Sequence, residues 1–327
     1  MSAPVTIQTP LALRDPERVD AGRTGASHLV TVTGPEITAE VLSAVLHRLV
    51  SVSTVVCGMR TMATHPCTAL ELSVRLSTPL GNAEAALRVG LGRLAGQCEV
   101  DISLLRAERR YGLVVFDVDN TLVVGEVVDR LAERAGRAAE VGVLTARTMR
   151  GELDFAESLR QRVAMLAGLP VGVLERVTSE IHLMPGALVA VRTLQALGVK
   201  VGAISGGFTP VVAALARSLR LDFHAANDLE VAEGHLTGRL TGELIDAPAK
   251  VRALRRFATT ERIPLPSCVA VGDGANDTDM LKAAGLGIAF NATDQVRAAA
   301  DVAVSYPRLD LVLPMLGVPV PCALVGG

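Results

Sequence analysis

Short apolar runs alternate with stretches of helical periodicity over most of the chain. Three of these runs, at 112–116, 199–204 and 268–271, each end abruptly in a polar or glycine-containing cluster and are followed by a helical pattern. Continuous apolar runs of this length are typical of buried parallel strands, because helices cover both faces of such a sheet. The pattern therefore predicts an α/β fold with a doubly wound parallel sheet, whose ligands lie beyond the carboxyl ends of its strands.

The stretch between the first and second runs is too long for a single crossover. About 70 residues there read almost entirely as helix, whereas one crossover helix needs only about a dozen residues. The surplus predicts a helical cap inserted over the sheet edge at about 126–184. A later alternating stretch with regularly spaced glycines, 230–245, predicts a β-hairpin. The cap helices are expected at 127–135, 140–150, 155–166 and 171–180.

The first third of the chain has a different pattern. Residues 1–26 are mixed polar sequence with three prolines, and we expect them to form a loose leader. Residues 27–108 carry elements in the order βαββαβ, which predicts a small α+β, ferredoxin-like domain ahead of a larger domain at 109–327. The expected strands are 29–33, 53–62, 70–76 and 99–105, and the expected helices are 37–49 and 82–94.

Composition then narrows the class of protein. Half of the 327 residues are apolar, so the chain can bury a large core. The net charge of −2 and the aromatic content of 2% provide neither a positive surplus nor stacking platforms, so nucleic acid is not an expected partner. Five cysteines without a C-x-x-C pair favour a reduced, cytoplasmic protein over a disulfide or zinc framework. No signal peptide is expected, because residues 1–20 contain charged residues and no apolar core of the required length. No membrane span is expected either, since prolines interrupt the uncharged stretch 311–327.

The polar clusters at the predicted strand ends carry the candidate chemistry. They are Asp117-Val118-Asp119-Asn120-Thr121, Ser205-Gly206-Gly207 and Gly272-Asp273-Gly274-Ala275-Asn276-Asp277. Taken alone, an aspartate pair at a strand end is as compatible with an Asx turn as with catalysis. Parallel strands bring their carboxyl ends to one edge, however, so these clusters and Lys250 are expected to meet. Carboxylates, an ammonium group and a Ser/Gly turn together favour a magnesium and phosphoryl site.

In this order, the segments resemble the four motifs of the haloacid dehalogenase superfamily. The first cluster is similar to its D-x-D-x-T motif, Ser205 to its second motif, Lys250 to its third and the Gly272 cluster to its fourth. Within the superfamily, Glu126, the stretch from Met149 to Phe155, and Arg162 resemble the phosphoserine phosphatase family. The resemblance covers residues 111 to about 305. The leading βαββαβ unit resembles the ACT domain, a module that often senses amino acids.

The resemblance implies a Mg²⁺-dependent hydrolysis of O-phospho-L-serine to L-serine and phosphate, the last step of serine biosynthesis. It implies that Asp117 forms an aspartyl phosphate, that Asp119 acts as acid and then base, and that Lys250 supplies positive charge. The implied Mg²⁺ ligands are Asp117, the backbone carbonyl of Asp119, and Asp273, with Asp277 more remote from the ion.

The resemblance also implies a substrate pocket that the cap completes. Glu126 is expected to pair with the substrate ammonium and Arg162 with its carboxylate, and Ser205 with the Gly206 amide is expected to orient a phosphoryl oxygen. Two apolar side chains of the cap are expected to exclude water. The implied substrate-binding residues are Glu126, Met149, Phe155, Arg162, Ser205, Gly206 and Asn276.

The ACT-like unit is expected to pair with a second copy through an exposed sheet face and edge, which predicts a homodimer. Its turn Thr33-Gly34-Pro35-Glu36 lacks the glycine-rich sequence of the family, so serine binding there is expected to be weak. Two alternatives stay open. One is an enzyme of the same fold for another small phosphomonoester, and the other is a non-catalytic amino-acid sensor. The intact Asp117, Asp119, Lys250 and Asp273 argue against the second.

Overall fold

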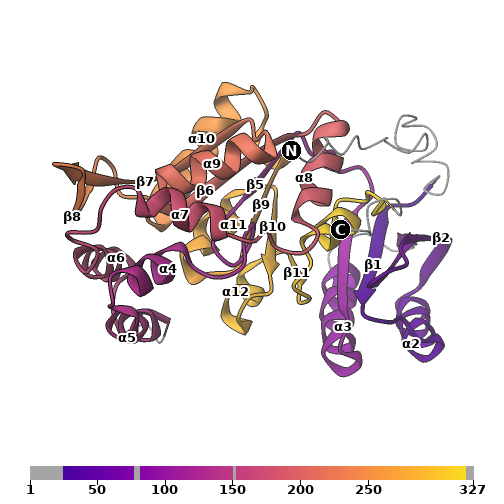
Figure 1. Ribbon diagram of the computed structural model, residues 1–327. Coiled ribbons are helices and arrows are strands. Elements are labelled where there is room, and N and C mark those ends of the chain that lie inside the picture. The colour runs from indigo at the N-terminus through magenta and orange to yellow at the C-terminus, as the bar shows by residue number, and fades with distance from the viewer. Residues whose placement is uncertain (1–24, 77–81, 150–151, 322–327) are drawn as a thin grey trace.

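Two units follow each other along the chain in the computed structural model, which describes residues 25–76, 82–149 and 152–321 (Figure 1). The expected leader, 1–26, lies almost entirely outside the described residues. The first unit is a four-stranded antiparallel sheet in the order β2-β3-β1-β4, which confirms the predicted ferredoxin-like fold. Its elements are β1 (His28–Gly34), α2 (Ala39–Val50), β2 (Thr54–Ala63), β3 (Thr68–Leu76), α3 (Asn82–Cys98) and β4 (Asp101–Arg106).

Helices α2 and α3 pack on one face of this sheet. The hydroxyl of Thr38 accepts a hydrogen bond from Val41 N and so begins α2 with a favourable N-cap. Alternate residues of the strands face the helices, because side chains along a strand point to opposite faces. The buried core contains Val30, Val32, Val45, Leu49, Leu72, Val74, Leu87, Leu91, Val100 and Leu104.

The other face of the first sheet packs against the second unit, and this corrects the expectation that it is exposed. The carboxylate of Asp101 accepts hydrogen bonds from Ser305 N at 2.6 Å and from Ser305 Oγ at 2.7 Å. Val320 N donates to Met62 O at 2.7 Å. The same chain therefore covers the face that we expected a second copy to use. The edge strand β2 remains accessible over 55–59, with Met59 57% exposed, whereas Met62 near its end is buried and accepts the bond from Val320 N.

The second unit is built on a seven-stranded sheet in the order β11-β10-β9-β5-β6-β7-β8. All neighbouring strands are parallel except β7 and β8, which form the predicted hairpin. The sequence analysis did not predict β10 or β11. The strands are β5 (Leu113–Phe116), β6 (Lys200–Phe208), β7 (Phe223–Ala232), β8 (His235–Thr241), β9 (Cys268–Gly272), β10 (Leu286–Phe290) and β11 (Val302–Val304).

Helices cover both faces of this sheet, as a doubly wound fold requires. Val114 and Phe116 of β5 face a core with α8 (Ala187–Ala196) and α9 (Thr209–Leu219). Leu113 and Val115, which alternate with them, face a second core with α10 (Ala247–Thr260), α11 (Thr278–Ala283) and α12 (Asp294–Ala299). The strand ends are thus held between two packed layers.

The predicted helical cap lies between β5 and β6 in the chain. Figure 1 shows its helices α4, α5 and α6 on the side of the sheet away from the first unit. Asp154 caps α6 by accepting from the amides of residues 156 and 157, so the helix begins at Phe155. The cap helices are α4 (Val127–Arg134), α5 (Ala138–Met149), α6 (Phe155–Ala164) and α7 (Val173–Glu180).

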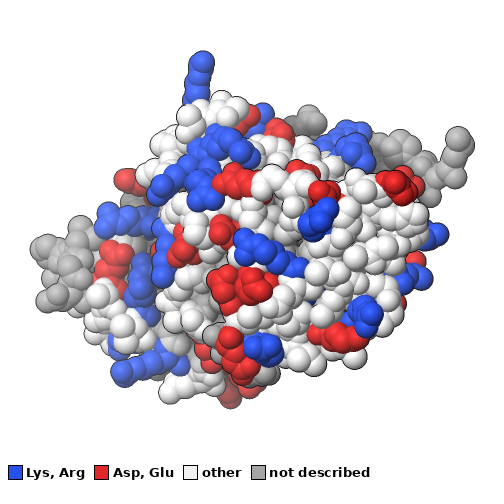
Figure 2. Space-filling view, turned by 90° about the vertical axis from the view of Figure 1, so that its left-hand side faces the viewer, with Lys and Arg blue, Asp and Glu red and all other residues white. Residues whose placement is uncertain are grey.

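Charged side chains are spread over the surface. On the side shown in Figure 2, lysines and arginines are interspersed with aspartates and glutamates. None of the helices in the described ranges combines the length and the apolar character that a membrane span requires.

Candidate active site

Asp117 lies directly after β5, in a loop with several backbone hydrogen bonds. Its own N–H donates to Val271 O of the neighbouring strand β9 at 2.8 Å, so the backbone remains in register with the sheet. The chain then turns at Asn120, which has a φ of 55°. Asparagine adopts this left-handed conformation more readily than most residues. The amide of Val123 donates to Val118 O at 3.0 Å and closes the loop, leaving Asp117 at the strand end.

Lys250 enters this strand end from the first turn of α10. The carboxylate of Asp246 caps the helix by accepting from Ala249 N at 2.9 Å, and Lys250 then lies on the buried side. Its Nζ lies 2.6 Å from Oδ1 of Asp117 and 2.6 Å from Oδ1 of Asp277. Burial alone would lower the pKa of Lys250, but the two carboxylates outweigh it and hold the pKa above its usual value. The lysine is therefore charged.

Three carboxylates form a compact cluster around this ammonium group. One oxygen each of Asp117, Asp273 and Asp277 lies within 4.8 Å of the others. Thr121 Oγ1 donates to Asp273 Oδ1 at 3.1 Å, and Gly274 N donates to Asp277 Oδ2 at 3.1 Å. These bonds orient the cluster from the loops after β5 and β9.

The cluster has an excess of negative charge that fits a divalent cation. Burial and the neighbouring carboxylates raise the pKa of Asp117 well above its usual value, although Lys250 opposes this, and burial and Asp277 raise the pKa of Asp273 to about 7. One ammonium group does not balance this set. Oxygen donors in a buried, anionic cluster are the ligands that a hard cation such as Mg²⁺ prefers.

Asp119 is held by the cap rather than by the cluster. Its Oδ1 accepts a hydrogen bond from Val127 N, at the start of α4, at 2.9 Å. Burial, and then the charge of Glu126, raise the pKa of Asp119 to about 7, against the effect of the hydrogen bond. Asp117 has a direct ammonium partner and Asp119 has none among the described residues, so their environments differ. Two adjacent carboxyl groups in different environments are suited to different roles.

Glu126 and Arg162 form an ion pair in the cap. Nη1 of Arg162 lies 3.1 Å from Oε2 of Glu126, and the arginine side chain is only 5% exposed. Nε of Arg162 is buried without a hydrogen-bond partner among the described residues. The sequence-based expectation gave each residue a separate group of the substrate, whereas in the structure they pair with each other. An anionic group bound beside Arg162 would supply the acceptor that this Nε donor lacks among the described residues.

The Ser205 turn faces both the loop of Asp119 and the cap. Ser205 Oγ is buried and accepts from Gly207 N at 2.8 Å. A methyl group at Gly206 would lie 2.7 Å from Cζ of Phe155, so the Phe155 side chain of the cap lies directly against this turn. A methyl group at Gly207 would lie 3.0 Å from Oδ2 of Asp119. The turn is thus close to the Asp119 side chain.

The remaining predicted site residues are less informative. Asn276 lies in the loop after β9, where its side chain folds over Gly274. Met149 is the last residue of α5, and its side chain lies outside the part that the structure describes. The structure also adds contacts that the sequence analysis missed, namely Thr121 on Asp273 and the Val127 amide on Asp119. The threonine was visible in the first motif, but no sequence signal identifies a backbone amide.

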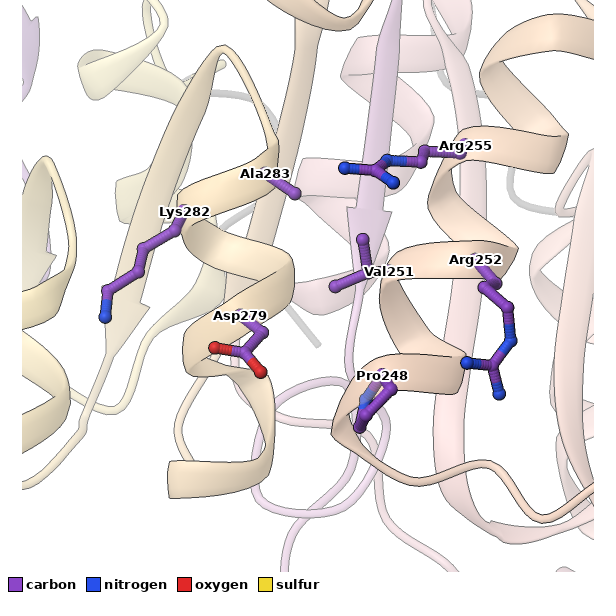
Figure 3. A pocket seen from close by; sticks show the side chains of 7 residues that line it. All are labelled: Pro248, Val251, Arg252, Arg255, Asp279, Lys282 and Ala283. Atoms are coloured by element: carbon purple, nitrogen blue, oxygen red, sulfur yellow. The ribbon is translucent and has the colours of Figure 1, made fainter.

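A separate groove of about 500 Å³ lies between α10 and α11. Figure 3 shows Val251 and Arg255 on one helix and Ala283 on the other facing the gap, whereas Lys282 points away from it. Arg252, which also lines the groove, pairs with Glu243. The groove shares no residue with the Asp117 cluster and is not part of the candidate site.

Comparison with known proteins first defines the class. The family model described as haloacid dehalogenase-like hydrolase matches residues 114–282, and the model described as ACT domain matches residues 26–105. These ranges fall within the second and first units. The sheet, the inserted helical cap and the Asp117 cluster at the strand ends therefore belong to a hydrolase of this class, joined to an ACT domain.

Individual relatives define the family more closely. Phosphoserine phosphatase SerB2 of Mycobacterium tuberculosis is 48% identical over 299 residues, which are 90% of this chain and 72% of that protein. The phosphoserine phosphatase of Lactococcus lactis is 47% identical over 202 residues, 62% of this chain and 94% of that protein. The chain therefore belongs to the phosphoserine phosphatase family of haloacid dehalogenase-like hydrolases.

Solved structures agree with this assignment. A phospho-aspartyl intermediate analogue of phosphoserine phosphatase superposes with a TM-score of 0.61 at 39% identity, covering 64% of this chain and all of that chain. The unliganded structure of a probable phosphoserine phosphatase from Vibrio cholerae has a TM-score of 0.70 at 31% identity, covering 94% of this chain and 93% of that chain.

Proposed function

We propose that this protein hydrolyses O-phospho-L-serine to L-serine and phosphate through an aspartyl phosphate on Asp117, as the last step of serine biosynthesis. The observation that carries the proposal is the contrast between two neighbouring carboxyl groups. Asp117 contacts the ammonium group of Lys250, which favours its ionised form against the effects of burial and of the neighbouring carboxylates on its pKa. Asp119 faces the cap without an ammonium partner among the described residues, and its pKa is raised to about 7. Nucleophilic catalysis needs the first group ionised, and acid catalysis needs the second partly protonated at neutral pH.

The reaction then proceeds in two displacements. Lys250 engages Oδ1 of Asp117, and Oδ2, which accepts no hydrogen bond from the described residues, attacks the phosphorus atom. The bond from phosphorus to the seryl oxygen breaks as Asp119 donates its proton to that oxygen, and L-serine leaves. The carboxylate of Asp119 next takes a proton from water, whose oxygen attacks phosphorus. The bond from phosphorus to the Asp117 oxygen breaks, phosphate leaves, and the carboxylate of Asp117 is regenerated. The proton taken from water restores the acid form of Asp119.

The proposed cofactor is Mg²⁺, held by Asp117, the backbone carbonyl of Asp119, and Asp273. Asp277 bonds to Lys250 and to Gly274 N, which supports a position outside the ligand shell. When bound, the ion supplies the positive charge that allows a phosphoryl dianion to approach this anionic cluster.

Substrate selection is proposed to reside in the Ser205 turn within β6 and in the cap. The hydroxyl of Ser205 and the amide of Gly206 orient a phosphoryl oxygen. Glu126 binds the substrate ammonium and Arg162 its carboxylate, so a bound amino acid inserts between two side chains that otherwise pair with each other. Phe155, which contacts Gly206, excludes water from the closed site.

We propose the domain boundaries 27–108 for an ACT-like regulatory and dimerisation domain and 109–327 for the phosphatase domain, with the cap at about 126–184. The two family-model matches support the division. A homodimer is proposed through the accessible edge strand β2, because the outer sheet face is already covered within the chain. Serine binding by the first domain is proposed to be weak.

The experiment that tests this function is a comparison of phosphomonoesters with purified protein and Mg²⁺. Release of phosphate is measured for O-phospho-L-serine, O-phospho-L-threonine and ethyl phosphate. The proposal expects kcat/KM for phosphoserine to exceed that for ethyl phosphate by at least about 10-fold, from one charge-assisted contact. A higher value for another ester would favour a different phosphomonoester, and no release from any ester would favour a non-catalytic sensor.

A further inference from the structure

The turn that we assign to phosphoryl binding is an interruption in the sheet. Strands β6 and β7 pair regularly up to Ile204 and Ala225, and pairing resumes only at Phe208 and Asn227. Three residues, 205–207, therefore lie opposite a single residue of β7. A bulge of this kind leaves backbone groups without their ladder partners and re-aims the strand. Something other than the sheet must hold the peptide groups of the turn.

The side chain of Asn227 holds the turn. Asn227 is 1% exposed, and its Nδ2 donates to Gly206 O at 2.8 Å. Its Oδ1 accepts from Ile245 N, also at 2.8 Å. Ile245 directly precedes Asp246, the cap of α10, and α10 carries Lys250 in its first turn. One buried amide group thus joins the turn to the segment that positions the lysine.

The peptide between Gly206 and Gly207 is consequently fixed at both ends. Its carbonyl oxygen accepts from Asn227, and its N–H donates to Ser205 Oγ. Because Ser205 Oγ is the acceptor in this bond, its own hydrogen is left to donate elsewhere, and it has no acceptor among the described residues. Loss of the Asn227 bond would allow this peptide to rotate, which would break the bond from Gly207 N to Ser205 Oγ and release the Ser205 hydroxyl from its orientation. The neighbouring peptide, which carries the Gly206 amide, would lose the rigid attachment on its C-terminal side.

We propose that Asn227 is a positioning residue for phosphoryl binding, acting through the Ser205 turn and without touching substrate. The inference rests on the proposed function only in that the turn binds the phosphoryl group. The inference predicts that substitution of Asn227 lowers kcat/KM by the same factor for every phosphomonoester. The reason is that Asn227 lies beside the turn that binds the phosphoryl group and not beside Glu126 and Arg162 in the cap.

The test uses the full chain with Asn227→Ala, Asn227→Asp and the control Gln195→Ala. Asn227→Asp keeps the acceptor for Ile245 N but places an oxygen against Gly206 O. Gln195 also bridges elements through backbone hydrogen bonds, from its Nε2 to Leu219 O and Arg220 O, at the end of α9 away from the turn. All assays are run below the melting temperature of each variant.

We expect both Asn227 variants to lose about 10- to 100-fold in kcat/KM on phosphoserine and on ethyl phosphate alike, since small misplacements at a reacting group have effects of this size. The inhibition constant of inorganic phosphate should rise in parallel, and Gln195→Ala should change neither quantity. Unchanged phosphate inhibition in the Asn227 variants, or an equal loss in Gln195→Ala, would overturn the proposal. Failure of the wild-type protein to prefer phosphoserine would count against the proposed substrate alone, because these ratios hold for any ester that is hydrolysed.

Discussion

Replacement of Arg162 by alanine tests how the proposed substrate is recognised. The side chain is buried in the cap, with Nη1 3.1 Å from Glu126 and Nε unpartnered among the described residues. A charge-assisted hydrogen bond contributes about 1.5 to 3 kcal/mol, and each factor of ten in rate corresponds to about 1.4 kcal/mol. We therefore expect Arg162→Ala to lower kcat/KM for phosphoserine by roughly 10- to 150-fold. For ethyl phosphate, which has no carboxylate, the loss should be small.

The assay is steady-state phosphate release, and the quantity compared is the ratio of kcat/KM for the two esters. The positive charge of Arg162 also lowers the pKa of Asp119, so its removal changes the proposed acid. This change affects the hydrolysis of both esters and therefore cancels in the ratio. Arg160→Ala is the matched control, since Arg160 lies on the same helix with its side chain 60% exposed, and its ion-pair partner among the described residues, Glu157, is 4.0 Å away. If Arg162→Ala reduced both esters equally, Arg162 would not bind the substrate carboxylate and the reasoning would be refuted.

Three further outcomes are expected. Chelation of divalent cations should abolish phosphate release and added Mg²⁺ should restore it, whereas activity that survives chelation would contradict the proposed ligands Asp117 and Asp273. Burial raises the pKa of Asp101 above its usual 3.8 in the folded protein. The protonated side chain therefore contributes stability that is fully present below pH 3.8 and is lost as the pH rises through the raised pKa of the folded state. Relative to the parent, Asp101→Asn should therefore gain in Tm as the pH rises from 3.8 through the raised folded-state pKa, and a pH-independent Tm difference would exclude this account. Sedimentation should give twice the chain mass, and Met59→Lys on the edge strand β2 should give a monomer; a dimer that persists would exclude that edge as the interface.

The convergence of the site was predictable because it follows from sheet topology. Asp117, Ser205 and Asp273 each end an apolar run, and the carboxyl ends of parallel strands share one edge. The helical surplus before the second run likewise predicted a cap, and its four helices lie close to the expected ranges. Strands β10 and β11 were missed, and β11 has only three residues, a run too short to be distinguished from buried helix by periodicity.

Contacts between distant parts of the chain were not predictable. Thr31, Glu71 and Ser103 share one face of the first sheet and are polar, as a solvated face would be, yet all three are buried. The second unit covers this face through bonds such as that between Asp101 and Ser305, which no local pattern encodes. Asn227 was missed for a related reason, since its importance comes from a bulge in the neighbouring strand and not from its own sequence context.

Direct detection of the covalent intermediate tests the central claim. Wild-type protein and Asp119→Asn are mixed with O-phospho-L-serine and Mg²⁺, quenched in acid within the first turnovers, and digested for mass spectrometry. We predict a phosphoryl group on Asp117 in both, longer-lived in Asp119→Asn because the base that activates water is absent. Asp117→Asn should carry no label and release no phosphate. Phosphate release by Asp117→Asn at a rate near that of the wild type, or a label on another residue, would contradict the mechanism.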